Sequence, residues 1–136
     1  MIRVVVVDDH DVVRLGLTRA IDSTGDMSVV GAARDGWEAL DVVHRVAPEV
    51  VLMDLSMPGM GGLEATRRIA VRDPRVRVVV LTAMPGRQHA GEARTAGAVA
   101  YLAKDGSVDD LLSTIRRVAR GGRSTDASAE RPVRAR

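Results

Sequence analysis

Cysteine and phenylalanine are absent from this 136-residue sequence, and its aromatic side chains are one tryptophan, Trp37, and one tyrosine, Tyr101. Without cysteine the chain can form neither a disulfide framework nor a thiolate metal site, which favours a cytoplasmic protein. The N-terminus leads directly into Ile2–Val7 and then into acidic residues, which is typical of neither a signal peptide nor a membrane span. With so few aromatic residues the core has to be aliphatic, and the length suffices for one such core.

Lysine is almost absent as well, since nineteen of the 20 basic residues are arginines and Lys104 is the single lysine. Because an ammonium is a compact point charge and a guanidinium is a planar fork, this usage indicates a position that needs the smaller group. The net charge of +2 is unevenly distributed: residues 1–115 carry 13 basic and 16 acidic side chains, whereas residues 116–136 carry seven arginines and two acids. The mildly acidic body therefore does not predict a nucleic acid surface.

Five valine-rich runs alternate with five segments of helical period. Runs that are apolar at nearly every position suit parallel strands covered on both faces, and we expect strands at Ile2–Val7, Ser28–Ala32, Val50–Met53, Val76–Leu81 and Ala98–Leu102. We expect the helices at Val12–Asp22, Trp37–Val46, Leu63–Val71, Gln88–Thr95 and Val108–Arg120. This alternation predicts an α/β fold with a doubly wound, five-stranded parallel sheet and five helices.

Apolar stripes predict the buried faces of the first and last helices. The first stripe is Val12, Leu15, Ala20 and Ile21, and the last is Val108, Leu111, Leu112, Ile115 and Val118. Ser107 is expected to cap the last helix, which should end at Gly121-Gly122. We expect one domain over residues 1–121. Residues 122–136 have almost no apolar side chains and should form a disordered, Arg-rich tail or the start of an interdomain linker.

Polar side chains follow four of the five predicted strands. Asp8 and Asp9 follow the first strand, Asp54 the third and Thr82 the fourth, and the fifth leads through Tyr101 to Lys104. Ligands of open parallel sheets bind beyond the carboxyl ends of the strands, where these groups meet. Three clustered carboxylates repel one another unless a cation joins them, and an all-oxygen set favours Mg²⁺. An ammonium and a hydroxyl beside the ion suit a phosphoryl group.

Taken singly, each of these residues has an ordinary structural explanation. An Asp-Asp pair after a strand is often turn chemistry, Asp54 fits a loop, Thr82 fits a strand end, and a lone lysine is usually solvated. Their joint placement at four strand ends favours the functional interpretation.

Four stretches of the sequence carry a family resemblance: DDH at residues 8–10, LMDLSMPGM at 52–60, LTA at 81–83 and GAVAYLAKD at 97–105. In order and spacing over residues 1–121, they resemble the receiver domain of two-component response regulators. That resemblance implies the CheY-like strand order 2-1-3-4-5. The DDH start and the Lys104-Asp105 pair are similar to the NarL/LuxR-type subfamily, whose members usually carry a C-terminal helix-turn-helix DNA-binding domain.

The resemblance assigns roles to particular residues. Asp54 is the expected phosphoacceptor, taking a phosphoryl group from a sensor histidine kinase. Asp9, Asp54 and the Ser56 main-chain carbonyl are the expected ligands of Mg²⁺, and Asp8 acts through water. Lys104 pairs with a phosphoryl oxygen.

Two further residues form the expected switch: Thr82 turns towards the phosphoryl group and Tyr101 follows. The output implied is transcription through a DNA-binding domain that this chain does not include, with a possible homodimer on phosphorylation. The domain would be a phosphoacceptor and switch rather than an enzyme.

Several residues depart from the family pattern or stay outside the predicted chemistry. Gly61 stands where an Asp often caps the third helix, Ala100 replaces a smaller Gly, and Pro85-Gly86 follows Thr82 in the loop that has to move. His10, His44 and His89 are expected at the surface without a chemical role. Trp37 is expected to pack the start of the second helix.

Three other functions fit parts of the sequence. A haloacid-dehalogenase-type phosphatase also uses an Asp nucleophile and Mg²⁺, and Asp9-His10-Asp11 matches its Asp-x-Asp signature, although such enzymes are larger. A stand-alone receiver acting by protein–protein interaction is the main alternative output. The Arg-rich tail could be a nucleic acid arm, but a solvated linker explains it more simply.

Overall fold

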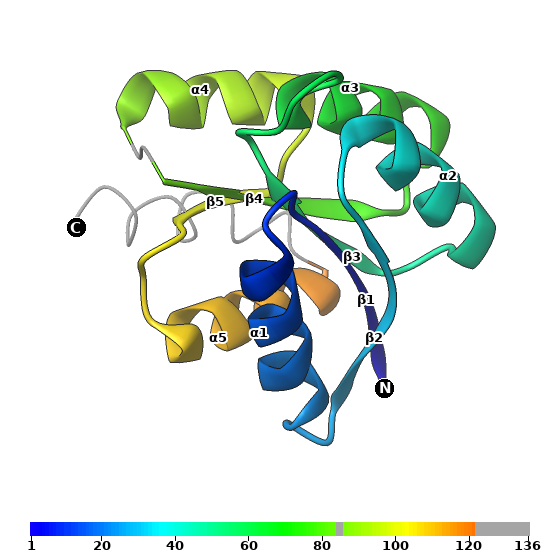
Figure 1. Cartoon of the computed structure of the whole chain (residues 1–136), viewed down its shortest axis with the longest axis vertical. Coiled ribbons are helices and arrows are strands. Elements are labelled where there is room, and N and C mark those ends of the chain that lie inside the picture. The colour runs from blue at the N-terminus through cyan, green and yellow to red at the C-terminus, as the bar shows by residue number, and fades with distance from the viewer. Residues whose placement is uncertain (84–85, 122–136) are drawn as a thin grey trace.

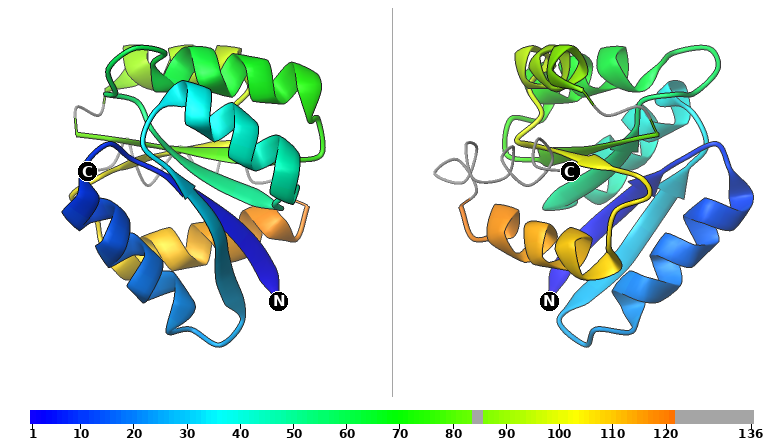
Figure 2. Two further views of the ribbon diagram at one scale, coloured as in Figure 1. Left: turned by 45° about the vertical axis from the view of Figure 1, so that its right-hand side comes forward. Right: turned by 90° about the vertical axis from the view of Figure 1, so that its left-hand side faces the viewer.

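The computed structural model describes residues 1–83 and 86–121. Its five parallel strands form one sheet in the order β2-β1-β3-β4-β5. The strands are β1 (Ile2–Val7), β2 (Met27–Ala33), β3 (Val50–Asp54), β4 (Arg77–Thr82) and β5 (Ala100–Ala103). The helices are α1 (Asp11–Asp22), α2 (Gly36–Val46), α3 (Gly62–Arg72), α4 (Arg87–Ala96) and α5 (Val108–Ala119). Helices α1 and α5 cover one face of the sheet and α2, α3 and α4 the other (Figure 1 and Figure 2), which confirms the predicted doubly wound fold.

The three central strands are buried along almost their whole length. Residues 4–7 of β1, all of β3 and residues 78–82 of β4 are shielded from solvent. Helices lie on both sides of these strands, so side chains that point either way have to be apolar. This is why the valine runs locate the strands to within one or two residues of the observed ends.

The predicted buried stripe of α1 is wrong at two positions. Val12 is 84% exposed and Leu15 is 51% exposed, whereas Ile21 is fully buried and Leu17 packs against the core. Leu17 and Ile21 are four residues apart and share a face, and at about 100° per residue Val12 and Leu15 fall on the opposite side of the helix. The face of α1 that packs on the sheet is therefore the one that carries Leu17 and Ile21.

The predicted stripe of α5 is correct except at its first residue. Leu111, Ile115 and Val118 are buried, but Val108 is half exposed because it stands at the first position of the helix, beside the loop that enters it. The Ser107 hydroxyl accepts a hydrogen bond from Asp110 N at 2.9 Å, which confirms the predicted cap.

Trp37 is 62% exposed, so the prediction that it packs the start of α2 is wrong. The buried face of α2 carries Gly36, Ala39, Val42 and Val43. Trp37 follows Gly36 by one residue and is turned about 100° away from that face. Its ring instead meets α3, where the guanidinium carbon of Arg68 lies 5.3 Å from the ring centroid.

The C-terminal end of α5 binds the turn between α1 and β2. Arg116 Nε and Nη2 donate to the two carboxylate oxygens of Asp26 at 2.8 and 3.2 Å, and these hydrogen bonds lower the pKa of Asp26 to about 2. The predicted helix end is confirmed at Gly121, which has a φ of 115°. The predicted disordered tail, Gly122 included, lies outside the described residues. No helix within those residues is long and apolar enough to cross a membrane.

The first residues of α2 and α3 pack directly against the backbone of the segment at the end of β3 and after it. A Cβ atom on Gly62 would overlap the carbonyl oxygen of Asp54 and lie 2.9 Å from Leu55 Cα. On the neighbouring helix, Gly36 N donates to Met60 O at 3.2 Å, and a Cβ there would come within 2.6 Å of that oxygen. Gly61 caps α3 without a side-chain hydrogen bond, as expected for glycine at this position. Close backbone contact therefore fixes the start of both helices against the segment that carries Asp54.

Replacing Gly62 by Ala should destabilise the protein by about 1–3 kcal/mol, because the added methyl group meets backbone that cannot move independently of Asp54. The matched control is Gly16→Ala in the middle of α1, where a Cβ meets nothing within 4 Å. That change should stabilise the protein by about 0.5–1 kcal/mol through helix propensity. Urea unfolding of both variants measures the difference, and equal stabilities would show that the Gly62 contact is not tight.

Candidate functional site

The carboxyl ends of β1, β3, β4 and the loop after β5 meet at one edge of the sheet. Backbone hydrogen bonds continue past the strand ends and hold the functional residues in register. Asp8 N donates to Ala33 O at 3.0 Å, and Lys104 N donates to Thr82 O at 2.8 Å. The sheet therefore brings together Asp8, Asp9, Asp54, Thr82 and Lys104, as the sequence predicts.

The ammonium of Lys104 lies between two buried carboxylates. Its Nζ is 2.8 Å from Asp8 Oδ2 and 3.5 Å from Asp54 Oδ2, and both carboxylate side chains are only 1% exposed. Burial opposes the charge of Lys104, but the hydrogen bond to Asp8 and the charges of both carboxylates outweigh it and raise the pKa of the ammonium. The single lysine of the chain is thus charged and held in the cluster.

Asp54 is held where its negative charge is disfavoured. Burial raises the pKa of Asp54 above 3.8, and the neighbouring charge of Asp8 raises it further. Opposing these effects, Ser56 N donates a hydrogen bond to Asp54 Oδ1 at 3.2 Å, and the Lys104 ammonium attracts the carboxylate. The same hydrogen bond keeps the backbone of Ser56 beside the carboxylate.

The cluster has more negative than positive charge, and its carboxylate oxygens outnumber the cationic groups beside them. Three carboxylates face one lysine, and the buried oxygens Asp8 Oδ2, Asp9 Oδ1 and Asp54 Oδ2 have only Lys104 Nζ or His10 Nδ1 beside them among the described residues. Ligand atoms from Asp8, Asp9, His10 and Asp54 all lie within 4.8 Å of one another. Buried carboxylate oxygens that outnumber the neighbouring cations suit a hard divalent cation, so these residues fit a metal such as Mg²⁺.

His10 is a neighbour of the cluster that the sequence analysis missed. Its ring is exposed as predicted, yet Nδ1 lies 3.2 Å from Asp8 Oδ1 and 3.1 Å from Asp9 Oδ1. His10 N also donates to Asp8 Oδ1 at 2.9 Å. This local turn, in which an Asp side chain binds the backbone two residues later, was the available signal. His44 and His89 lie on helix surfaces near Asp73 and Glu92, as expected.

Thr82 and Tyr101 form the buried border of the site towards α4. The two side chains are 3% and 2% exposed. Burial raises the pKa of Tyr101, against the effect of hydrogen bonds with the Gly86 backbone and the Thr82 side chain. The tyrosine therefore lies inward and is connected both to Thr82 and to the residue that precedes α4.

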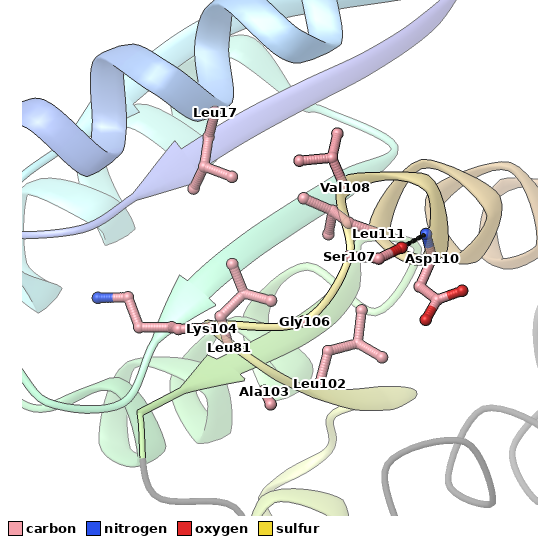
Figure 3. A pocket seen from close by; sticks show the side chains of 10 residues that line it. All are labelled: Leu17, Leu81, Leu102, Ala103, Lys104, Gly106, Ser107, Val108, Asp110 and Leu111. Carbon is pink, nitrogen blue, oxygen red and sulfur yellow. Dashed lines mark hydrogen bonds between the residues drawn. The ribbon is translucent and has the colours of Figure 1, made fainter. Parts of the chain in front are cut away.

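A small apolar hollow lies behind Lys104, between α1 and the start of α5. It has a volume of about 70 Å³, and its lining consists of Leu17, Leu81, Leu102, Ala103, Lys104, Gly106, Ser107, Val108, Asp110 and Leu111. Figure 3 shows the Lys104 amino group pointing away from these leucines. Its Nζ atom lies 2.8 Å from Asp8 Oδ2 instead. The hollow thus borders the site, and Lys104 is the lining residue whose charged group reaches the carboxylates.

Comparison with known proteins agrees with this geometry. The response regulator receiver domain family matches residues 4–116. Response regulator GacA of Pseudomonas aeruginosa is 42% identical over 123 residues, which are 90% of this chain and 58% of GacA. The chain therefore spans less than two thirds of the length of this relative.

Two solved structures show the same arrangement. A LuxR-family two-component response regulator from Aurantimonas sp. SI85-9A1 superimposes with a TM-score of 0.86 and 34% identity, covering 98% of both chains. The signal receiver domain of the response regulator NarL from Mycobacterium tuberculosis gives a TM-score of 0.84 and 33% identity, covering 88% of this chain and 97% of the receiver. These matches confirm the resemblance to NarL/LuxR-type regulators, and the chain belongs to the response regulator receiver domain family.

Proposed function

We propose that Asp54 is the phosphoacceptor of this receiver and that a sensor histidine kinase supplies the phosphoryl group. The observation that carries the proposal is the burial of the Asp54 carboxylate and its distance from Lys104. Its Oδ2 atom is buried and lies 3.5 Å from Lys104 Nζ, farther than the 2.8 Å that separates the same ammonium from Asp8 Oδ2. An oxygen that is held in place and not tightly paired with a donor is available as a nucleophile.

The transfer exchanges one bond to phosphorus for another. An Asp54 oxygen attacks the phosphorus of a phosphohistidine, an O–P bond forms, and the N–P bond breaks with its electron pair returning to the imidazole. Lys104 favours the ionised form of Asp54 before the attack and pairs with a phosphoryl oxygen after it. Thr82 donates a hydrogen bond to another phosphoryl oxygen.

The carboxylate cluster supports a role for Mg²⁺ in the same step. Asp9, Asp54 and the main-chain carbonyl of Ser56 would hold the ion, and Asp8 would act through water. Bound Mg²⁺ supplies positive charge that neutralises the phosphoryl oxygens as charge shifts between them.

Thr82 and Tyr101 connect the site to the rest of the domain. Tyr101 is already buried against Thr82 and Gly86. A movement of Thr82 towards a phosphoryl group would therefore change the contacts of Tyr101 with the start of α4. We infer that the switch passes through this contact to the α4–β5–α5 face and there promotes a homodimer. The output is transcription through a separate DNA-binding domain, as the resemblance to NarL/LuxR-type regulators implies. A stand-alone receiver is the alternative.

A phosphatase of the haloacid-dehalogenase type is disfavoured by the position of Asp11. That mechanism needs the second Asp of Asp9-His10-Asp11 at the site, but Asp11 is exposed and pairs with Arg14 at 2.5 Å. The domain therefore acts as a phosphoacceptor and switch.

Incubated with acetyl phosphate and Mg²⁺, the protein should gain one acid-labile phosphoryl group on Asp54, because this carboxylate lies at the end of the central strand β3 between Asp8 and Lys104. Asp54→Asn should abolish the modification, and so should EDTA. Intact-mass spectrometry and peptide mapping measure both. The matched control is Asp11→Asn, which changes an exposed Asp near the cluster and should leave the modification intact. Phosphorylation that persists in Asp54→Asn contradicts the assignment.

Lys104→Arg should not restore the function of the lysine, even though the charge is kept. The ammonium sits 2.8 Å from Asp8 and 3.5 Å from Asp54, and a longer planar guanidinium would not fit between the two carboxylates. A charge-assisted hydrogen bond contributes roughly 1.5–3 kcal/mol, so the affinity for beryllium fluoride with Mg²⁺ should fall about tenfold to a hundredfold in both Lys104→Arg and Lys104→Ala.

NMR shifts of Tyr101 and of α4 report this binding. An affinity of Lys104→Arg equal to that of the parent would show that the single lysine is an accident of composition.

A further inference from the structure

Two exposed apolar side chains share a groove between α2 and α3. These helices lie on the face of the sheet away from α1 and α5 (Figure 2). Trp37 of α2 is 62% exposed and Val71 of α3 is 81% exposed. Both line a hollow of about 640 Å³, with the half-buried Leu40 between the helices. The two side chains offer apolar contact area at the surface, and the Arg68 guanidinium carbon lies 5.3 Å from the centroid of the Trp37 ring.

The acidic groups in this groove are already paired. Glu64 accepts hydrogen bonds from Arg68 Nε at 2.8 Å and from Arg67 Nη1 at 2.5 Å, and these contacts lower the pKa of Glu64. Asp41 accepts a hydrogen bond from Arg45 Nη1 at 2.7 Å. Neither carboxylate is thus a free anion at the groove.

Two arginines at and beyond the C-terminal end of α3 are not paired. Arg72 and Arg75 are exposed, and neither side chain forms a hydrogen bond or ion pair with any residue that the structure describes. Arg72 ends α3 and also lines an adjoining hollow of about 500 Å³, which Arg75 and Arg77 line with it. The groove therefore runs from the exposed apolar side chains of Trp37 and Val71 to the unpaired guanidinium groups of Arg72 and Arg75.

We propose that this α2–α3 groove docks an acidic peptide segment of a partner protein, with apolar side chains of that segment on Trp37 and Val71 and its carboxylates on Arg72 and Arg75. A guanidinium binds a carboxylate through two parallel hydrogen bonds, and an aromatic ring beside it supplies apolar contact area. This surface is separate from the phosphoacceptor site and makes no use of it.

The charges of the groove favour a peptide over a polyanion or a second copy. A continuous polyanion such as nucleic acid would lie across Asp41 and Glu64 as well as the arginines, on a body that carries 13 basic and 16 acidic side chains over residues 1–115. A second copy that docked through the same face would bring free arginines of its own, which repel Arg72 and Arg75. A peptide with a few acids and apolar residues meets only the favourable groups.

The single tryptophan of the chain makes binding visible. The probe is a short helical peptide with leucine on one face and glutamate on the other, and the control peptide has glutamine in place of glutamate. The first peptide should shift the fluorescence of Trp37 in a saturable way, and the second should bind at least about tenfold more weakly.

Arg72→Glu should weaken the acidic peptide by about tenfold or more, and calorimetry should show the same loss in Trp37→Ala. The matched control is Arg19→Glu on α1, an exposed arginine on the opposite face of the sheet, which should bind the peptide like the parent. Melting temperatures of all variants, together with beryllium fluoride binding at the Asp54 site, establish that each is folded.

Several results would overturn the proposal. One is equal binding of the two peptides, and another is an Arg72→Glu variant that binds the acidic peptide like the parent. Saturable binding of single-stranded DNA that depends on Arg72 would assign the groove to nucleic acid instead. A dimer in sedimentation velocity that Trp37→Ala dissociates would assign it to a second copy.

Discussion

Mutual repulsion between the Asp8 and Asp54 carboxylates, relieved in part by one lysine, is the constraint on which the site depends. Both side chains are withdrawn from water and both lie within 3.5 Å of Lys104 Nζ. The lysine cannot neutralise both, and Asp9 adds a third negative charge to the cluster. The backbone hydrogen bonds of the parallel sheet hold these groups close together. The fold therefore maintains an excess of negative charge that a cation and a phosphoryl group, arriving together, would balance.

The two sides of the site around Asp54 differ in how freely they can move. Gly62 and Gly36 allow α3 and α2 to begin in direct contact with the loop after β3, so the segment that carries Asp54 has little freedom. On the other side, Thr82 and Tyr101 connect the site to the start of α4. One border of the site is thus rigid and the other has a hydroxyl that can turn. A change of charge at Asp54 would therefore move Thr82 and Tyr101 rather than the start of α2 or α3.

The sequence predicted the strands and the cluster because both depend on local patterns. Strands buried on both faces need apolar residues at every position, and Asp8, Asp54 and Lys104 follow directly from the carboxyl ends of such strands. The face of α1 was not predictable in the same way, since it depends on Leu17 meeting residues of β4, β5 and α5 that are distant in the chain. Trp37 was misplaced for the same reason, because its neighbour Arg68 belongs to another helix.

A direct test of the charge constraint is an NMR titration of the Asp54 carboxyl carbon in protein labelled with ¹³C-aspartate. In EDTA, Asp54 should titrate with a pKa above 3.8, because burial and the Asp8 carboxylate disfavour its ionised form. Addition of Mg²⁺ should move the titration to lower pH, since a bound cation favours the carboxylate. The account would be contradicted by an Asp54 pKa at or below 3.8 in EDTA that Mg²⁺ leaves unchanged.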